Sequence, residues 1–404
     1  MHRTGFVLLT VTLCACGDAA QPTPPRPPAQ SDLTGWYEVR RGPAFDVATL
    51  PSLGGSTARG NSINARGWVA GYANLPDGQT RHATLWRDGS IQDLGTLGGP
   101  NSNVAWPGQN DRTTIAGIAE LAQLDTLNES WSCSAFFPSI TGHVCRGFVW
   151  ENGAMRALPV LGGENGFATG VNDRGDVVGW AETTVHDPTC NTPQVLQFRA
   201  VQWDARTHRA LELRPLRGDS TSAATAINDR GQVVGISGKC DVAVGEFSAR
   251  HSVMWDHGRP HRIDDFGGVA WNTPMAINDE GDVAGFANSG SAAGGTFDPR
   301  AFLWTRSGGT RNLGTLPGDV SSQATGINND KQVVGVSCGD AVCRAFLWQN
   351  GVMLDLNRLV GQGFKDTLVS AQDINDDGAI TGRLMEANTG KGFAFIATPR
   401  RGKQ

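Results

Sequence analysis

The chain has 404 residues, with 34 basic and 39 acidic side chains and a formal net charge of −5, so no excess of positive charge favours nucleic-acid binding. Glycine accounts for 53 residues, roughly 13% of the chain and about twice its usual share. These glycines follow no three-residue period and stand among Val, Ile, Leu and Trp, which excludes collagen and low-complexity disorder. A globular chain rich in turns remains.

Residues 1–15 are predicted to be a lipoprotein signal peptide, with a positive charge at Arg3 followed by a short apolar run. The junction Leu13-Cys14-Ala15-Cys16-Gly17 resembles a bacterial lipobox, so Cys16 is the expected lipidation site. Cys14 fits less well, because bulky Leu13 precedes it. An ordinary cleaved secretory signal, giving a secreted soluble protein, is the alternative. Residues 16–33 carry five prolines and are predicted to be an extended tether.

The remainder repeats one unit seven times. An Ile-Asn-Asp-x-Gly-x-Val-Val-Gly phrase, degraded in its second copy, recurs with Asn at positions 64, 110, 172, 228, 278, 328 and 375, at intervals of 46 to 62 residues. A second phrase ends in Trp or a substitute, and that slot holds Trp86, Trp150, Trp203, Trp255, Trp304 and Trp348. A Leu-Gly-x-Leu phrase closes the unit. Equal phrases at unequal spacing indicate one supersecondary unit with loop insertions.

Each unit is predicted to form four short strands, over residues 222–227, 232–237, 250–255 and 259–264 in the fourth copy. These runs are rich in β-branched and aromatic residues, and Gly and Asn bound them. Seven such units predict an all-β fold: a seven-bladed β-propeller of four-stranded antiparallel blades. A ring of six or eight blades and an open β-solenoid are the alternatives.

The two ends of the repeat region predict how the ring closes. The last copy stops after its third strand, and the missing phrase stands near the N-terminus at residues 45–55. We therefore expect an N-terminal strand at residues 46–50 to pair with residues 393–397 and complete the last blade. The expected organisation is a single propeller domain over residues 34–398, followed by a tail at residues 399–404.

These phrases resemble the HAF family of extracellular repeat proteins, which is named for a His-Ala-Phe tripeptide ahead of the Trp slot. The resemblance spans about residues 45–398. Here the tripeptide is imperfect, since Arg300 and Arg344 stand where His is expected and Thr84 replaces Phe. The resemblance implies an exported repeat protein and no particular reaction.

Six cysteines fall between a second and a third strand, on one side of the predicted ring. Their even number and the exported context favour disulfides over a zinc site, because no Cys-x-x-Cys spacing occurs. We expect Cys133 to pair with Cys145 and Cys338 with Cys343 within their loops. Cys190 is expected to pair with Cys240 across adjacent blades.

Loops cross-linked in this way suit a binding face, although protection from proteolysis would also account for them. Trp131 and Trp271 are the best candidates for exposed aromatic residues that contact a ligand. Tyr72, Trp180 and Phe286 end second strands on the same side and are further candidates, with packing between blades as the alternative.

Several patterns that resemble chemical sites have simpler explanations. The Asn-Asp-x-Gly turns lack the length and the terminal Glu of a calcium loop, so local hydrogen bonding accounts for them. Gly335-Val336-Ser337-Cys338-Gly339 matches a nucleophile elbow, but Gly335 is a repeated strand glycine. We predict no catalytic residue, metal site or cofactor.

The sequence favours a lipid-anchored scaffold at the bacterial envelope, either at the outer membrane or at the cell surface. Its partner would be a protein or a glycan, it would contact the membrane through the anchor alone, and it would be a monomer. The alternative is a propeller-type hydrolase or lyase acting on an extracellular glycan, since propellers host both kinds of activity.

Overall fold

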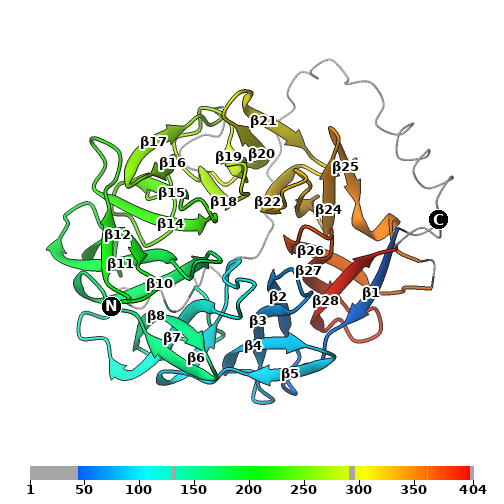
Figure 1. The fold of residues 1–404 in the computed structure, drawn as a ribbon, viewed down its shortest axis with the longest axis horizontal. Coiled ribbons are helices and arrows are strands. Elements are labelled where there is room, and N and C mark those ends of the chain that lie inside the picture. The colour runs from blue at the N-terminus through cyan, green and yellow to red at the C-terminus, as the bar shows by residue number, and fades with distance from the viewer. Residues whose placement is uncertain (1–43, 130–132, 134, 291–295, 362, 401–404) are drawn as a thin grey trace, which may run out of the picture.

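The computed structural model describes residues 44–129, 133, 135–290, 296–361 and 363–400. Over these residues the chain forms seven four-stranded antiparallel sheets arranged around a central axis (Figure 1). The fold is the predicted seven-bladed β-propeller. The predicted signal peptide, the Pro-rich tether, Cys16 and Trp131 lie outside the described residues. Among those residues, no helix has the length and apolar character needed to cross a bilayer.

Each blade follows the same order of strands from the axis outward, and the first three blades have the following bounds. Blade 1 contains β2 (Ala58–Ile63), β3 (Val69–Asn74), β4 (Arg81–Arg87) and β5 (Ser90–Asp93). Blade 2 contains β6 (Gly98–Asn103), β7 (Ile115–Leu124), β8 (His143–Glu151) and β9 (Ala154–Ala157). Blade 3 contains β10 (Gly162–Val171), β11 (Val177–His186), β12 (Leu196–Trp203) and β13 (Ala210–Leu213).

The remaining blades repeat this arrangement. Blade 4 contains β14 (Thr221–Ile227), β15 (Val233–Gly238), β16 (His251–Asp256) and β17 (Arg259–Ile263). Blade 5 contains β18 (Thr273–Ile277), β19 (Val283–Asn288), β20 (Pro299–Thr305) and β21 (Gly309–Gly314). Blade 6 contains β22 (Ser321–Ile327), β23 (Val333–Cys338), β24 (Cys343–Gln349) and β25 (Val352–Asp355). Blade 7 contains β26 (Thr367–Ile374), β27 (Ile380–Met385), β28 (Gly392–Pro399) and β1 (Phe45–Thr49).

The ring closes in blade 7, where the N-terminal strand lies beside the C-terminal one (Figure 1). β1 pairs with β28 in an antiparallel register from Phe45 opposite Pro399 to Thr49 opposite Phe395. The amide of Leu50 extends the ladder by donating to the carbonyl of Ala394 at 2.8 Å. This pairing is the one predicted from the missing phrase, and it ties the two ends of the propeller into one sheet.

The repeated Val-Val-Gly glycine is explained by a bulge in the neighbouring first strand. Six of the seven first strands shift register by one residue near their turn, for example between Ala224 and Ala226 in blade 4. A Cβ on Gly235 would lie 2.1 Å from the carbonyl oxygen of Ala223, and Gly335 would meet Gln323 at 2.0 Å. Only glycine fits opposite the bulge, so Gly335 has a packing role.

The repeated asparagine closes its own turn and also bonds to the next blade. The Oδ1 atom of Asn228, for example, accepts the amide of Gln232 at 2.9 Å, while Nδ2 donates to the carbonyl of Asn278 at 2.9 Å. The same inter-blade bond joins every consecutive pair of blades, at 2.8 to 3.4 Å, and Asn375 completes the circle with Asn64. These seven bonds form the asparagine ring.

The residue after each asparagine forms a second, outer series of bonds. The Oδ1 atoms of five aspartates and Asn329 accept a backbone amide from the preceding blade, at 2.7 to 2.9 Å. The series is interrupted at Ala65, which has no side-chain acceptor. The Asn-Asp motif therefore links blades, which is why it recurs once in every repeat.

Three of the repeated tryptophans bond to the connection that precedes their blade. Trp203 and Trp255 are almost completely buried, and their Nε1 atoms donate to the carbonyls of Pro159 and Arg214 at 2.8 and 2.7 Å. Trp86 makes the equivalent bond to Pro51. A buried indole with a satisfied N–H contributes large apolar area without leaving an unpaired donor.

Candidate functional site

The propeller has two chemically different faces. The turn face carries the Asn-Asp turns, which join first to second strands, and the hairpins that join third to fourth strands. The loop face carries the loops that join second to third strands and the connections between blades. Loop lengths vary strongly on this second face: residues 125–142 in blade 2 form a long insertion, whereas residues 339–342 suffice in blade 6.

Three disulfides cross-link the loop face. Cys133 bonds to Cys145, Cys190 to Cys240 and Cys338 to Cys343, the same pairs expected from their positions in the repeats. Multiple disulfides indicate an extracytoplasmic protein, because reducing compartments do not maintain them.

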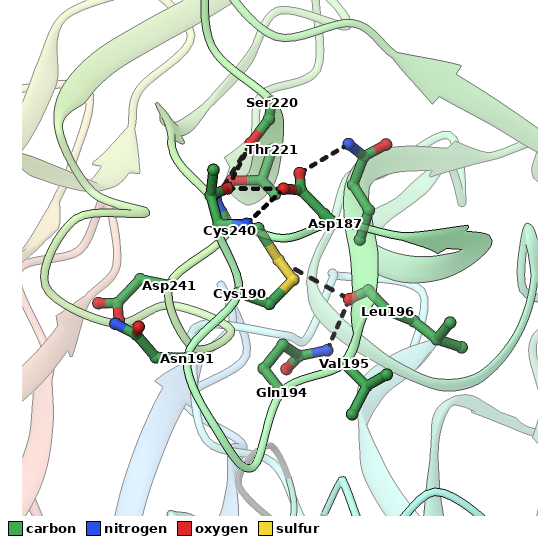
Figure 2. Close-up of a disulfide and its surroundings, with 12 residues drawn as sticks. Asp187, Cys190, Asn191, Gln194, Val195, Leu196, Ser220, Thr221, Cys240 and Asp241 are labelled. Atoms are coloured by element: carbon green, nitrogen blue, oxygen red, sulfur yellow. Dashed lines mark hydrogen bonds between the residues drawn. A yellow bond between two sulfur atoms is a disulfide. The ribbon is translucent and has the colours of Figure 1, made fainter.

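The Cys190–Cys240 disulfide joins the loops of blades 3 and 4 (Figure 2). Beside it, the amide of Asn191 donates to the carbonyl of Asp241 at 3.0 Å, and the two side chains also hydrogen-bond. The amide of Cys240 donates to Ser220 Oγ at 3.1 Å. These bonds and the disulfide hold the two loops in one position.

Two predicted aromatic candidates come together on blade 5. Trp271 is partly exposed, and its ring centroid lies 5.2 Å from that of Phe297. Phe286 lies 5.9 Å from the same Phe297 ring, and Phe297 itself is 41% exposed. Phe297 was not predicted, because it stands outside every repeated phrase. The three rings form an aromatic cluster that reaches the surface.

Trp180 occupies the core and offers no surface to a ligand. It has no exposed area and packs between Phe167 and Phe198, at centroid distances of 6.4 and 5.7 Å. Its place among the binding candidates is therefore corrected, and packing between blades explains it. The core cluster around the indole combines Phe167 and Phe198 of blade 3 with Ile118 of blade 2 and Ala223 of blade 4.

Tyr72 lies among three arginines at the loop-face end of blade 1. The guanidinium carbon of Arg81 lies 3.9 Å from the ring centroid of Tyr72, and that of Arg59 lies 5.3 Å away. Burial opposes ionisation of the phenol, but the positive charges of Arg59, Arg81 and Arg383 hold its pKa below the ordinary value. Tyr72 is therefore part of a polar cluster, although only 5% of its surface is exposed.

A buried carboxyl supports the loops of blades 2 and 3. Glu182 has no exposed surface; its Oε2 accepts the amide of Asn165 at 2.7 Å, and its Oε1 accepts Gln194 Nε2 at 3.0 Å. Gln194 Nε2 also donates to Glu129 Oε1 at 3.1 Å. Burial and then the charge of Glu129 raise the pKa of Glu182 to about 8. Burial thus favours the protonated form of Glu182 more strongly than in an ordinary glutamate.

The turn-face end of the central channel forms a cavity of about 210 Å³, lined by the Asn-Asp turns of all seven blades. Gln109 also lines it, and neither polar atom of its buried amide has a hydrogen-bond partner among the described residues. The pKa of Asp229 is raised above its ordinary value, mainly by partial burial and to a smaller extent by the negative charges of Asp173 and Asp279. The Oδ1 atoms of these aspartates accept hydrogen bonds between blades, as described above.

His82 and His251 occupy the same position in their repeats, and both have local partners. His82 Nδ1 lies 2.8 Å from Asp93 Oδ2, and His251 Nδ1 lies 2.9 Å from Asp219 Oδ2. Arg344 occupies the same repeat position and pairs with Asp319 and Asp355 at 2.8 and 3.0 Å. In these three blades the position therefore carries a basic side chain bonded to a carboxylate at the loop-face end of the third strand.

Comparison with known proteins yields similarity of fold only. No protein-family model matches the chain, and no curated protein sequence matches it. A gluconolactonase, XC5397 from Xanthomonas campestris, has 11% identity and a TM-score of 0.37 over 88% of this chain and 90% of its own. TolB from Acinetobacter baumannii has 11% identity and a TM-score of 0.40, over 83% of this chain and 64% of its own.

The PQQ-bound aldose sugar dehydrogenase from Streptomyces coelicolor has 10% identity and a TM-score of 0.35, over 89% of this chain and all of its own. At these values the similarities do not bear on activity.

The sequence analysis did not identify three arginines near Tyr72: Arg59, Arg81 and Arg383. For Arg383, however, the repeats contain a signal. Arg383 stands opposite Ser370 in the second strand of blade 7, the position that Tyr72, Trp180 and Phe286 occupy in other blades. A positively charged residue at a position that holds aromatic or aliphatic residues in the other blades could have identified Arg383 as a candidate site residue. That blades 7 and 1 bring these arginines together is a consequence of ring closure.

Proposed function

We propose that this protein is an exported, lipid-anchored scaffold of the HAF type that binds a glycan or a protein through its loop face at the bacterial envelope. The observation that carries the proposal is the partly exposed aromatic cluster of Trp271, Phe286 and Phe297 on the loop face. The amide of Trp271 donates to the carbonyl of Glu246 at 3.2 Å, in the loop of blade 4 that the Cys190–Cys240 disulfide holds. Rigid loops that present aromatic side chains lose little conformational entropy on binding.

A binding screen tests this role. The purified protein is screened against glycans, and the exported protein is cross-linked to its neighbours in the native envelope. Trp271→Ala and Phe297→Ala are expected to weaken binding about tenfold or more. Leu211→Ala is the matched control, because Leu211 is 59% exposed on the outer strand β13, away from the cluster. Equal binding by all three variants contradicts the proposal.

Anchoring through Cys16 is part of the proposal and has its own test. Wild-type protein is expected to incorporate labelled fatty acid and to fractionate with membranes. Cys16→Ser should lose both properties, whereas Cys14→Ser should incorporate label as the wild type does. Label that depends on Cys14, or membrane association without label, would overturn the assignment.

A glycan lyase is the second candidate, and Tyr72 is the observation that favours it. A phenol whose pKa is lowered by three arginines could remove the proton next to the carboxylate of an acidic sugar, whose charge the arginines would neutralise. Elimination of the neighbouring glycosidic oxygen would leave a carbon–carbon double bond in the product. Appearance of this unsaturated product, abolished by Tyr72→Phe, would establish the lyase in place of the scaffold.

A further inference from the structure

Two guanidinium groups lie over the Tyr72 ring where the first and last blades meet, and the charge of a third arginine, Arg383, also acts on this phenol. Arg59 lies at the start of β2, Arg81 begins β4 and Arg383 lies in β27, so all three occupy the loop-face ends of their strands. Arg59 and Arg81 lie within 5.3 and 3.9 Å of the Tyr72 centroid. Each arginine is partly exposed, so the cluster is accessible to solvent.

None of the three arginines forms an ion pair with a carboxylate of the described residues. Arg81 is held by neutral acceptors, with Nε donating to Asn74 Oδ1 at 3.0 Å and Nη1 to the carbonyl of Phe136 at 2.8 Å. Other arginines of the loop face have carboxylate partners: Arg300 pairs with Asp298 and Arg199 with Glu212. In contrast to Arg300 and Arg199, the three arginines of this cluster carry positive charge without a carboxylate partner among the described residues.

Hydrogen-bonding capacity is also left unused here. The Nε atoms of Arg59 and Arg383 are buried and have no acceptor among the described residues. Gly392 leaves space for the Arg383 side chain, because a Cβ at that position would lie 2.3 Å from its Nε. Buried donors without acceptors are costly, and so are like charges held close together. A bound anion would relieve both costs.

Aromatic and polar groups adjoin the arginines on the side of blade 2. The carbonyl of Phe136 accepts both Arg81 Nη1 and Asn103 Nδ2. The ring of Phe136 lies 5.2 Å from that of Trp106, whose Nε1 is buried without an acceptor. Both rings are partly exposed. Aromatic faces next to bidentate cation donors suit a sugar ring that bears a carboxylate.

We propose that Arg59, Arg81 and Arg383 form a binding site for the carboxylate of a uronic acid residue in an extracellular acidic glycan. The inference rests on the proposed binding function and specifies the class of ligand. Arg81 is preoriented by its bonds to Asn74 and Phe136, and the partly exposed guanidinium groups of Arg59 and Arg383 supply further donors. The sugar ring lies against the neighbouring aromatic side chains.

Calorimetric titration of the purified protein with oligogalacturonate tests the site. The matched ligands are the same oligomer with its carboxylates methyl-esterified and a sulfated neutral oligosaccharide. The acid form is expected to bind at least about tenfold more tightly than the ester, with affinity falling as salt concentration rises. Tighter binding of the sulfated ligand would overturn the assignment to a carboxylate.

Substitutions locate the binding site on the protein. Arg59→Gln and Arg383→Gln are each expected to weaken oligogalacturonate binding about tenfold or more. Arg199→Gln is the control, because it removes the same charge from the same face at a residue that already has a carboxylate partner. Thermal unfolding of each variant verifies folding, and Arg59→Lys should restore part of the affinity if Arg59→Gln is unstable.

The outcomes separate this inference from the proposed function. If the arginine variants bind oligogalacturonate as the wild type does, the anion site is wrong. If neutral glycans or proteins still bind in a Trp271-dependent manner, the proposed function stands without it. If the protein binds no glycan and no protein partner, both proposals fail.

Discussion

The turn face and the loop face are built by the same seven repeats but are stabilised in different ways. On the turn face, the asparagine ring makes one equivalent bond in every blade, and the aspartate series adds six more. On the loop face, three disulfides and individual contacts such as that of Gln194 Nε2 with Glu129 Oε1 hold loops whose lengths differ from blade to blade. The repeated hydrogen bonds of the turn face therefore hold the blades together, while the loops of the loop face differ between blades and give that face its surface.

This difference between the two faces indicates where the protein can bind a ligand without loss of stability. The turn-face aspartates accept hydrogen bonds between blades, so changing them alters the ring. The arginines around Tyr72 and the ring of Trp271 make no such repeated bond. Function on the loop face can therefore vary independently of ring closure, which is consistent with binding residues carried by loops on a rigid scaffold.

The largest expected effect comes from breaking the ring itself. Deletion of residues 33–55 removes β1 and leaves β28 as an exposed edge. The loss of about five ladder bonds and of Phe45 from the core should lower the melting temperature by about 10 °C or more. A chain lacking only residues 33–43 retains β1 and is the control. An unchanged melting temperature in the longer deletion would show that β1 does not close the ring.

Removing disulfides should affect the loop face in proportion to the chain length that each one closes. Cys190–Cys240 spans 50 residues and Cys338–Cys343 spans 5. The chain-entropy relation then predicts losses of about 4 and about 2 kcal/mol for the paired Ala variants. Denaturant unfolding measures both. A larger loss from the short disulfide would show that local loop packing, and not the length of the closed loop, governs the stability of this face.

The buried carboxyl of Glu182 should make the loop face sensitive to pH. Burial in the folded state raises its pKa to about 8 from the ordinary value of 4.5, so the folded protein binds this proton more tightly than the unfolded chain does. The free energy of unfolding should therefore fall by about 4 kcal/mol as pH rises from about 4.5 to 8. Glu182→Gln should remove this dependence, as measured by denaturant unfolding at several pH values. A decline that persists in the variant would assign it to other groups.

A single turn tests the asparagine ring, with a smaller expected effect. Asn328→Ala removes the acceptor for the amide of Gln332 and the donor to the carbonyl of Asn375. Because both partners are then left without a bond near the channel, unfolding should cost about 2 kcal/mol less free energy. Asp330→Ala changes an exposed residue of the same turn and should have little effect. Similar losses in the two variants would mean that the ring bonds contribute no more than the local turn.

Much of the fold could be predicted because the same sequence pattern occurs in seven copies, one for each blade. Three features each correspond to one place in a blade: the glycine of Val-Val-Gly, the turn asparagine and the Trp slot. The glycine is required because the bulge opposite Gly235 leaves no room for a Cβ. The missing phrase at the C-terminus predicted β1, and the cysteine positions predicted the three disulfides. The candidate site was predicted less well: Trp271 and Phe286 were found, but Trp180 is buried and Phe297 was missed.

By itself, the sequence determined the number of blades, their strands and the closure of the ring, because these depend on local phrases with a fixed period. Only the tertiary structure decided which side chains meet across the ring. Arg59 and Arg383 are 324 positions apart, yet both lie beside Tyr72 because β1 brings blade 7 against blade 1. Similarly, the aspartates of the Asn-Asp turns accept hydrogen bonds from neighbouring blades because the closed ring places each turn beside the next. Contacts of this kind depend on the geometry of the closed ring, which no single repeat contains.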